Sequence, residues 1–591
     1  MGADGARMIA EPQSGDNVYS RAVAMSAPAD LVLVNAKVIT VDPRFSLARA
    51  VAARGGRIAM VGEDAQVCAL LGPDTRVVDA GGRAVMPGLV DGHAHMDREG
   101  LKALLPSLEG CASIDDVLQR IEALVRESEP GRWIVTMPLG DPPQYWDVPQ
   151  NLRERRFPDR RDLDRVSPQN PVYIRAIWGY WRHTLPLVSI ANSRALEAAG
   201  ITRETQPPCG AVEIDRDPAT GEPTGIFIER TYVPIVELVL MPAATRFTHA
   251  DRVRGLAASQ RVYNAAGTTT VFEGHGVAAE VLRVYREVWE RGGLTVRSHL
   301  VTSPSWSPPG GTSFDAILGS WGAGLAGRGL GDEWLRVAGL HAEADPPPED
   351  AIRARAMPYT GWAGFGYGAG LPRAQVKAML LAAARHGIRV VSAGTRLLDL
   401  YEEVDRETPI GDLRWVIAHV SLVRPDEIRR MRDLGVVVTT HTNRYIYKEG
   451  ALLRSRAAPG EDMVVPLRSL VEAGVHTALA TDNVPPSLWH PVWHAVARVD
   501  RTTGDVVGPA QRLSREAALR AATIEGAWLT FQEREQGSIE PGKRADFVVL
   551  SEDPLTVPEE RLLGIVADLT VAGGRVVYER GGGSGTLPEP G

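Results

Sequence analysis

The pattern of apolar and polar positions differs between the two ends of the chain and its middle. At both ends, short runs alternate apolar with polar residues and are rich in β-branched side chains, with Gly and Asn between them. Such alternation over short runs predicts β-strands joined by turns. The runs lie at 31–42, 50–62, 76–97, 537–554 and 564–581. Because chain termini commonly lie close together, we predict one small β-sandwich built from both ends of the chain.

The middle of the chain repeats a unit in which an apolar, β-branched run follows roughly ten residues with apolar positions three or four apart. Alternating helices and strands of this kind predict a parallel sheet. The runs are 265–274, 294–303, 334–345, 386–394, 413–420, 435–442 and 474–483. Eight or so strands over about 400 residues favour a closed (β/α)8 barrel of the TIM type over an open sheet. No GxGxxG motif follows an early strand, which argues against a dinucleotide-binding sheet.

One long segment, residues 105–245, does not follow this pattern and is rich in Trp, Pro and Arg. We predict that it forms a large insertion, which could act as a lid over the barrel. Residues 302–331 and 358–371 are rich in Gly and aromatic residues, and we expect either functional loops or mobile surface there. The predicted division is a flexible tail or arm at 1–28, sandwich at 29–87, barrel at 88–534, sandwich again at 535–581 and a flexible tail at 582–591.

Composition and charge narrow the class of protein. The 65 Lys and Arg residues against 73 Asp and Glu give a net charge of −8, so no basic surface for nucleic acid or anionic membranes is expected. No apolar run approaches the roughly 20 residues that span a bilayer, and residues 1–28 lack the pattern of a signal peptide. Three cysteines, none in a CxxC pair, indicate a reducing compartment. We expect a cytoplasmic protein that acts on a small molecule.

Histidine and carboxylate residues close the predicted barrel strands. His93 and His95 stand two residues apart in GLVDGHAHMD, so on a strand both side chains point to one face. Other predicted strands end with His341 and Glu343, with Glu273 and His275, with His419, with His441 and with Asp482. Active sites of α/β barrels lie at this end of the strands, and imidazole with carboxylate suits a divalent ion. Any one histidine could be a hydrogen-bonded core residue, but their recurrence on five strands favours a metal site.

These motifs resemble a known family. The N-terminal strands, AVMPGLVDGHAH, the late ATD and the closing GSIEPGKRADFVVLSEDP are similar to the amidohydrolase superfamily of metal-dependent hydrolases. Residues 171–201, 209–229 and 418–441 resemble the branch that includes N-substituted formamide deformylases, amidohydrolase family 3. The resemblance implies a distorted (β/α)8 barrel, a small β-sandwich from both chain ends, and one or two divalent ions, usually zinc, at the barrel mouth. It also implies a homo-oligomer, a dimer or larger.

The resemblance assigns a role to four residues at the strand ends. His93 and His95 match the ligands of the first strand, His419 matches the histidine of the sixth, and Asp482 matches the aspartate of the last. We therefore expect one metal ion held by His93, His95 and Asp482. Zn²⁺ is the favoured metal, and Fe²⁺ and Mn²⁺ are the alternatives. Either His341 or His419 would complete the set.

Two positions depart from the pattern of the family. The fourth-strand lysine, which in the family becomes carboxylated and bridges two ions, is replaced by His341, and an imidazole cannot form a carbamate. The fifth-strand histidine is replaced by Val391 or Ser392. These departures favour one ion over two, although Glu273 or Glu343 could take the place of the bridging anion.

The predicted reaction is hydrolysis of a C–N bond, other than a peptide bond, in an amide, an N-substituted formamide or a cyclic amide. The ion would activate water, and Asp482 would accept and return the proton. Either the ion itself or a histidine, His341 or His419, would stabilise the oxyanion. The alternatives are a metal-dependent decarboxylase or esterase on the same scaffold, or a degenerate barrel that binds without catalysis.

Aromatic residues near the insertion and in the Gly-rich loop are candidates for substrate binding. They could stack on an aromatic substrate, or they could pack the insertion onto the barrel. The candidates are Trp178, Trp181, His183, Tyr359 and Trp362, and Phe365 lies in the same Gly-rich loop.

Overall fold

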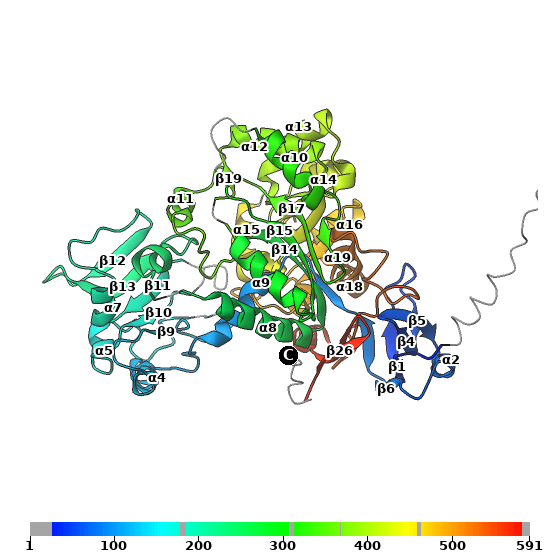
Figure 1. Cartoon of the computed structure of the whole chain (residues 1–591), viewed down its shortest axis with the longest axis horizontal. Coiled ribbons are helices and arrows are strands. Elements are labelled where there is room, and N and C mark those ends of the chain that lie inside the picture. Colours follow the sequence, from blue (N-terminus) through cyan, green and yellow to red (C-terminus); the bar gives the residue numbers. More distant parts are fainter. Residues whose placement is uncertain are drawn as a thin grey trace, which may run out of the picture.

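The computed structural model describes residues 27–581 apart from 144, 146, 178–184, 245, 307–312, 367 and 458–461. A central body of strands and helices has the lobe formed within residues 105–245 on one side and the small N-terminal sheet on the other (Figure 1). Within the described ranges, no helix combines the length and the apolar character needed to cross a membrane.

Eight parallel strands form the sheet of the central body. In spatial order they are β8 (Leu89–Asp91), β14 (Thr268–Val277), β15 (Arg297–Thr302), β17 (Leu335–His341), β20 (Val390–Ala393), β21 (Val416–Ala418), β22 (Val437–Thr440) and β23 (Thr477–Leu479). Hydrogen bonds join the two ends of this sheet: Gly92 N–H donates to Leu479 O at 3.0 Å, and Asp482 N–H donates to His93 O at 2.9 Å. The first and last strands therefore meet, and the predicted (β/α)8 barrel is confirmed.

Helices alternate with the strands, as the spacing of apolar positions predicts. One of them, α10 (Phe314–Leu325), lies within residues 302–331, where we expected functional loops or mobile surface, so that expectation is wrong for these residues. Thr248 caps the first long helix by accepting a hydrogen bond from Asp251 N–H, and Pro425 opens another, where a missing N–H costs nothing. These helices are α8 (His249–Ala265), α9 (Ala279–Glu290), α10 (Phe314–Leu325), α12 (Arg373–Arg385), α13 (Leu398–Glu407), α14 (Pro425–Asp433) and α16 (Leu467–Glu472). In Figure 1, α10, α12, α13 and α14 lie together on one side of the strands.

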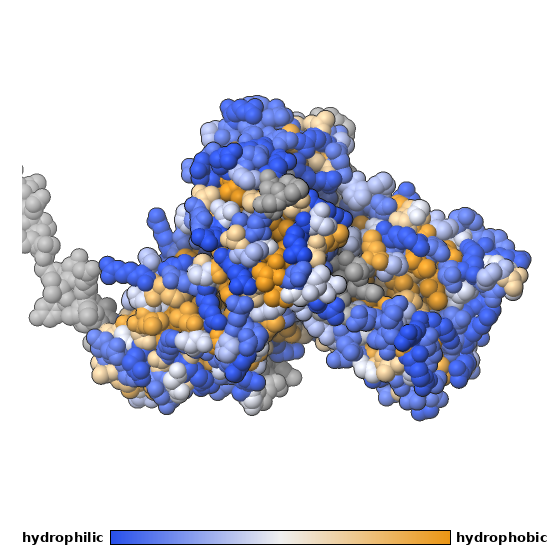
Figure 2. Space-filling view, turned by 180° about the vertical axis from the view of Figure 1, so that it is seen from behind, coloured by the Kyte–Doolittle hydropathy of each residue, from blue (hydrophilic) through white to orange (hydrophobic). Residues whose placement is uncertain are grey.

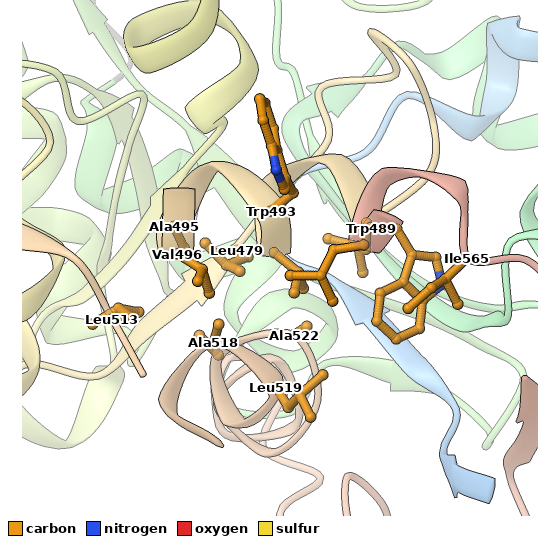
Figure 3. Close-up of a cluster of buried hydrophobic side chains, with 14 of the residues drawn as sticks. Leu479, Trp489, Trp493, Ala495, Val496, Leu513, Ala518, Leu519, Ala522 and Ile565 are labelled. Atoms are coloured by element: carbon orange, nitrogen blue, oxygen red, sulfur yellow. The ribbon is translucent and has the colours of Figure 1, made fainter. Parts of the chain in front are cut away.

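A large apolar cluster fixes the last strand of the barrel against the C-terminal helices. Leu479 of β23 packs with side chains of α17 (Trp489–Ala497) and α18 (Arg515–Ala521). Figure 3 shows Leu479 and Val496 on the side of α17 that faces Ala518 of α18, whereas Trp493 points away. Trp489 and Leu519 are almost completely buried there. Because burying apolar surface is worth about 25 cal/mol per Å², this cluster holds the segment that follows β23 in place.

The β-sandwich unites the two ends of the chain, as predicted. One sheet has the order β5 (Arg57–Gly62), β4 (Ala50–Arg54), β1 (Leu31–Val34), β6 (Arg76–Asp79). The other has the order β26 (Arg575–Glu579), β25 (Ala567–Ala572), β24 (Phe547–Leu550), β7 (Ala84–Pro87), β2 (Lys37–Ile39), β3 (Leu47–Ala48). Met86 of β7 pairs with Val548 of β24 in antiparallel register, and Leu33 packs against Phe547 in the shared core.

The segment that broke the barrel pattern folds as a lobe with its own sheet. Its strands have the order β12 (Val212–Arg216), β13 (Pro223–Glu229), β11 (Leu187–Ala191), β10 (Val172–Ile174), β9 (Ile134–Thr136). Its helices are α4 (Ile114–Arg126), α5 (Arg160–Asp164) and α7 (Ser193–Ala198). Seen from behind, apolar residues gather on this lobe toward the central body, and its outer surface is mostly hydrophilic (Figure 2).

A buried ion pair joins the barrel to the sandwich. Arg297 Nε and Nη2 of β15 donate to the two carboxylate oxygens of Asp546 at 2.8 and 3.0 Å, and both side chains are at most 4% exposed. The guanidinium also stacks on Trp334, 4.2 Å from the ring centroid. Such bidentate pairs are geometrically specific, so this contact sets how the two domains meet.

We expect Asp546→Ala to lower the free energy of unfolding by about 3–5 kcal/mol, because it leaves the Arg297 charge buried without its partner. Urea-induced unfolding measures the change. The control is Glu472→Ala, which removes an exposed pair with Arg468 and should cost at most about 0.5 kcal/mol. If both variants lose the same stability, the pair does not hold the domains together.

Candidate metal centre

Five strands of the barrel bring imidazole and carboxylate side chains to one end of the sheet. Each donor lies in the last residues of its strand or directly beyond it, where the carboxyl ends of parallel strands meet. His93 and His95 follow β8, His275 lies in β14, His419 follows β21, His441 follows β22 and Asp482 follows β23.

Two of these donors stand in strained backbone. His419 has φ +58° and Asp482 has φ +51°. This is a left-handed backbone conformation that residues other than Gly rarely adopt. Each such residue costs on the order of 1–3 kcal/mol, and such strain persists where the surroundings hold it, typically at functional sites. These two side chains therefore point toward the common centre at a cost in folding stability.

The donor atoms lie close together. His95 Nε2 is 3.0 Å from Asp482 Oδ1, and His93 Nε2 is 3.9 Å from the same oxygen. His93 Nε2 is also 3.2 Å from His419 Nε2. On the far side, His441 Nε2 is 2.8 Å from His419 Nδ1, and His441 Nδ1 is 3.3 Å from Asp482 Oδ2.

Three overlapping sets of these donors have the spacing of a metal site, with ligand atoms within 4.8 Å of one another. The sets are His93, His95 and Asp482; His93, His275 and His419; and His419, His441 and Asp482. Ligand atoms that each lie about 2.0–2.2 Å from one ion are at most about 4.4 Å apart, so small movements suffice. Asp482 Oδ2 is buried without a hydrogen-bond partner among the described residues, as an atom awaiting a ligand would be. The donors therefore fit a divalent ion.

Burial sets the protonation state of the cluster. It lowers the pKa of His95 to about 4 and that of His441 to about 3, and it places the pKa of His93 well below the ordinary value. Burial opposes the charge of Asp482, but the nearby imidazoles, His441 foremost, hold the pKa of its carboxyl well below the ordinary range. At neutral pH the cluster thus offers neutral imidazoles and a carboxylate, the forms that bind metal ions.

The structure brings together four of the five predicted ligands. His93, His95, His419 and Asp482 meet, while His341 stands behind His275, its ring stacked on that ring at 4.3 Å. None of the donor sets found among the described residues contains His341. Of the two histidines expected to complete the metal site, His419 lies among the donors and His341 does not. The role of each residue in binding a metal ion stays a prediction.

Sequence reasoning left two donors out of the predicted site, His275 and His441. Both residues stand at the ends of predicted strands, and this position was the sequence signal that could have placed them in the site. At the fifth strand, where the family pattern expects a histidine, Val391 points into the apolar interior and Ser392 bonds to Tyr401 Oη at 2.8 Å. His275 of the second strand instead faces His93 and His419.

Aromatic residues of the Gly-rich loop divide between packing and the site. Tyr359 Oη accepts a hydrogen bond from Phe247 N–H at 2.9 Å, and Trp362 is buried beneath the Arg175 guanidinium at 4.5 Å. Both lie where the insertion meets the barrel. Phe365 lies against the ring of His275 at 4.2 Å and so lines the metal cluster. Trp178, Trp181 and His183 lie outside the described residues.

Buried arginines hold this loop against the barrel. Arg252 Nη2 donates to Gly361 O at 2.8 Å and Arg98 Nη1 donates to Ala363 O at 3.3 Å. Gly364 has φ +77°, and a Cβ there would lie 1.9 Å from Asp97 Oδ2. The backbone at Gly364 therefore approaches the cluster more closely than any side chain would allow.

We expect Gly364→Ala to lower both the thermal midpoint and the metal content of the purified protein. The control is Gly474→Ala, at φ +81° with nothing within 4 Å of its added Cβ. Both changes incur the cost of left-handed backbone, about 1–2 kcal/mol, and the clash with Asp97 adds about 1–3 kcal/mol at Gly364 alone. Equal effects of the two variants would contradict the close approach.

Comparison with known proteins agrees with this geometry. Residues 76–578 match the family model described as "Amidohydrolase family". The chain is 29% identical to an N-substituted formamide deformylase of Arthrobacter pascens, over 94% of this chain and 100% of that protein. It is 26% identical to the protein LONG AFTER FAR-RED 3 of Arabidopsis thaliana, over 91% of each. An uncharacterized metal-dependent hydrolase of Pyrococcus horikoshii shares the fold, with a TM-score of 0.64 and 21% identity over 90% of this chain and 99% of that one.

Proposed function

The chain belongs to the amidohydrolase family, and we propose that this metal-dependent hydrolase cleaves the C–N bond of an N-substituted formamide or a related small amide. The observation that carries the proposal is the cluster of neutral imidazoles around a buried carboxylate at the barrel mouth. The similarity to a deformylase, over 94% of this chain and the whole of that protein, supports the choice of bond.

We assign the ion to the set formed by His93, His95 and Asp482, with His419 beside it. These are nitrogen and oxygen donors, which suit Zn²⁺ and also Fe²⁺ or Mn²⁺. A divalent ion bound there would supply Lewis-acid activation of water at neutral pH.

Asp482 is the residue that moves the proton. Its Oδ1 faces the ligand histidines, while Oδ2 is buried without a hydrogen-bond partner among the described residues. Oδ2 accepts the proton of the attacking water and passes it to the leaving nitrogen, which departs as an amine. His441 Nδ1 lies 3.3 Å from this oxygen.

Stabilisation of the oxyanion falls to a histidine of the cluster. Of the two candidates, His419 lies among the donors, whereas His341 is separated from them by the ring of His275. We therefore assign this role to His419. Phe365 covers the cluster on one side, and a drier site strengthens the interaction with developing charge.

The proposal is tested by metal analysis followed by a substrate panel. We expect about one divalent ion per chain, and formate release from N-substituted formamides that exceeds hydrolysis of matched acetamides and formate esters. Decarboxylation of aromatic acids or ester cleavage alone would place another reaction on the same scaffold. No bound metal after reconstitution would refute the hydrolytic proposal and favour a binding barrel.

We expect Asp482→Asn to fold normally and to lose about 10²- to 10⁴-fold in kcat, because the amide cannot accept the proton. The control is Asp399→Asn, an exposed acid whose change should leave kcat within experimental error. Circular dichroism verifies that the variant is folded, and kcat is compared at equal metal content because Asp482 is also assigned as a ligand. Near-normal kcat with metal bound would show that another group is the base.

A further inference from the structure

The ring of His95 lies between two buried carboxylates that come from opposite sides of it. Nε2 is 3.0 Å from Asp482 Oδ1, and Nδ1 is 3.8 Å from Glu273 Oε2. The three side chains are at most 4% exposed. The ring therefore has one nitrogen toward the metal cluster and the other toward a carboxylate behind it.

Glu273 is held firmly in this position. Its Oε1 accepts two hydrogen bonds, from Met96 N–H at 2.7 Å and from Tyr285 O–H at 2.8 Å. Its Oε2 is buried and has no hydrogen-bond partner among the described residues. Because Met96 follows His95 directly, one carboxylate orients both the backbone beside the ligand and the oxygen that faces the ring.

The chemistry of imidazole decides between two roles for Glu273. A neutral ring has one nitrogen with a free lone pair, and the other nitrogen carries a proton. A second donor set, His95, Asp97 and Glu273, also lies within 4.8 Å, but it would need the lone pair on Nδ1. Both sets could bind ions together only with a doubly deprotonated ring. Nε2 already lies at 3.0 Å from Asp482, so it is the nitrogen directed at the ion.

We propose that Glu273 is a positioning residue that accepts the Nδ1–H of His95 and so holds the tautomer in which Nε2 binds the metal. This inference rests on the proposed metal site. A carboxylate behind a ligand histidine fixes the orientation of the ring and raises its basicity, and its loss typically weakens metal binding about 10- to 100-fold. Nδ1 and Oε2, 3.8 Å apart, must come closer to form this hydrogen bond.

The test is zinc affinity of the metal-free protein, measured by competition with a chromogenic chelator. Glu273→Gln should weaken zinc binding about 10- to 100-fold while the thermal midpoint of the metal-free protein changes little. The matched control is Glu343→Gln, a partly buried acid in β18 (Glu343–Ala344) outside every donor set found in the described ranges, and its affinity should equal that of the wild type. Tyr285→Phe, which removes one of the bonds that orient Glu273, should give a severalfold loss.

The outcomes separate this inference from the proposed function. Wild-type protein that binds no zinc refutes the metal site itself. Wild-type protein that binds zinc while Glu273→Gln binds it equally well refutes only the positioning role. A fall from two ions to one per chain in Glu273→Gln would make Glu273 a ligand, which also overturns the inference. If Glu273→Gln does not fold, Tyr285→Phe decides, and unchanged affinity there is the refuting result.

Discussion

The hydrogen bonds that close the barrel between β8 and β23 hold the centre of the site together. Asp91 Oδ1 accepts from His93 N–H at 3.1 Å and from Thr481 N–H at 3.0 Å, and Asp482 N–H donates to His93 O. His93 and Asp482, the first and last donors along the chain, are thus joined by one main-chain hydrogen bond and by the shared bonds of the Asp91 carboxylate to the segments that hold them. Without this closure the first and last strands would separate, and no arrangement of side chains could restore the 3.0–3.9 Å spacing around Asp482.

Around that closure, the site combines features that each cost stability. Imidazoles and carboxylates are buried, two donors adopt left-handed backbone, and Gly364 brings main chain against Asp97. The surrounding packing makes this tolerable, above all the cluster of Leu479 and Trp489 behind the last strand. Strain and burial concentrate at the barrel mouth, while the apolar interior and the helices around it are regular.

Much of this arrangement could be predicted from the sequence, because its signals are local. Strand alternation and helical spacing gave the barrel and the sandwich, and the HxH motif with the late aspartate gave His93, His95 and Asp482. His275 was recognised at a strand end but not assigned as a ligand, because the resemblance gave roles only to four other residues. The register of β14 shifts between Glu273 and Val277, so strand parity alone does not say what each side chain faces. The insertion at 105–245 was predicted, but its internal sheet was not, because strands of 3–7 residues are too short to show a period. For Trp362 the sequence left open whether it binds substrate or packs the insertion onto the barrel, because no local pattern reveals a contact with a distant segment.

The pairing of β7 with β24 has a consequence for how the chain is made. Residues 87 and 547 are neighbours in one sheet, so the 459 residues of 88–546 must be synthesised between the two strands. At about 5–20 residues per second, the N-terminal strands wait for tens of seconds before their partners leave the ribosome. During that time the edge of β7 is open to pairing with other chains. The risk of aggregation is therefore greatest during translation, before β24 is available to cover the edge of β7.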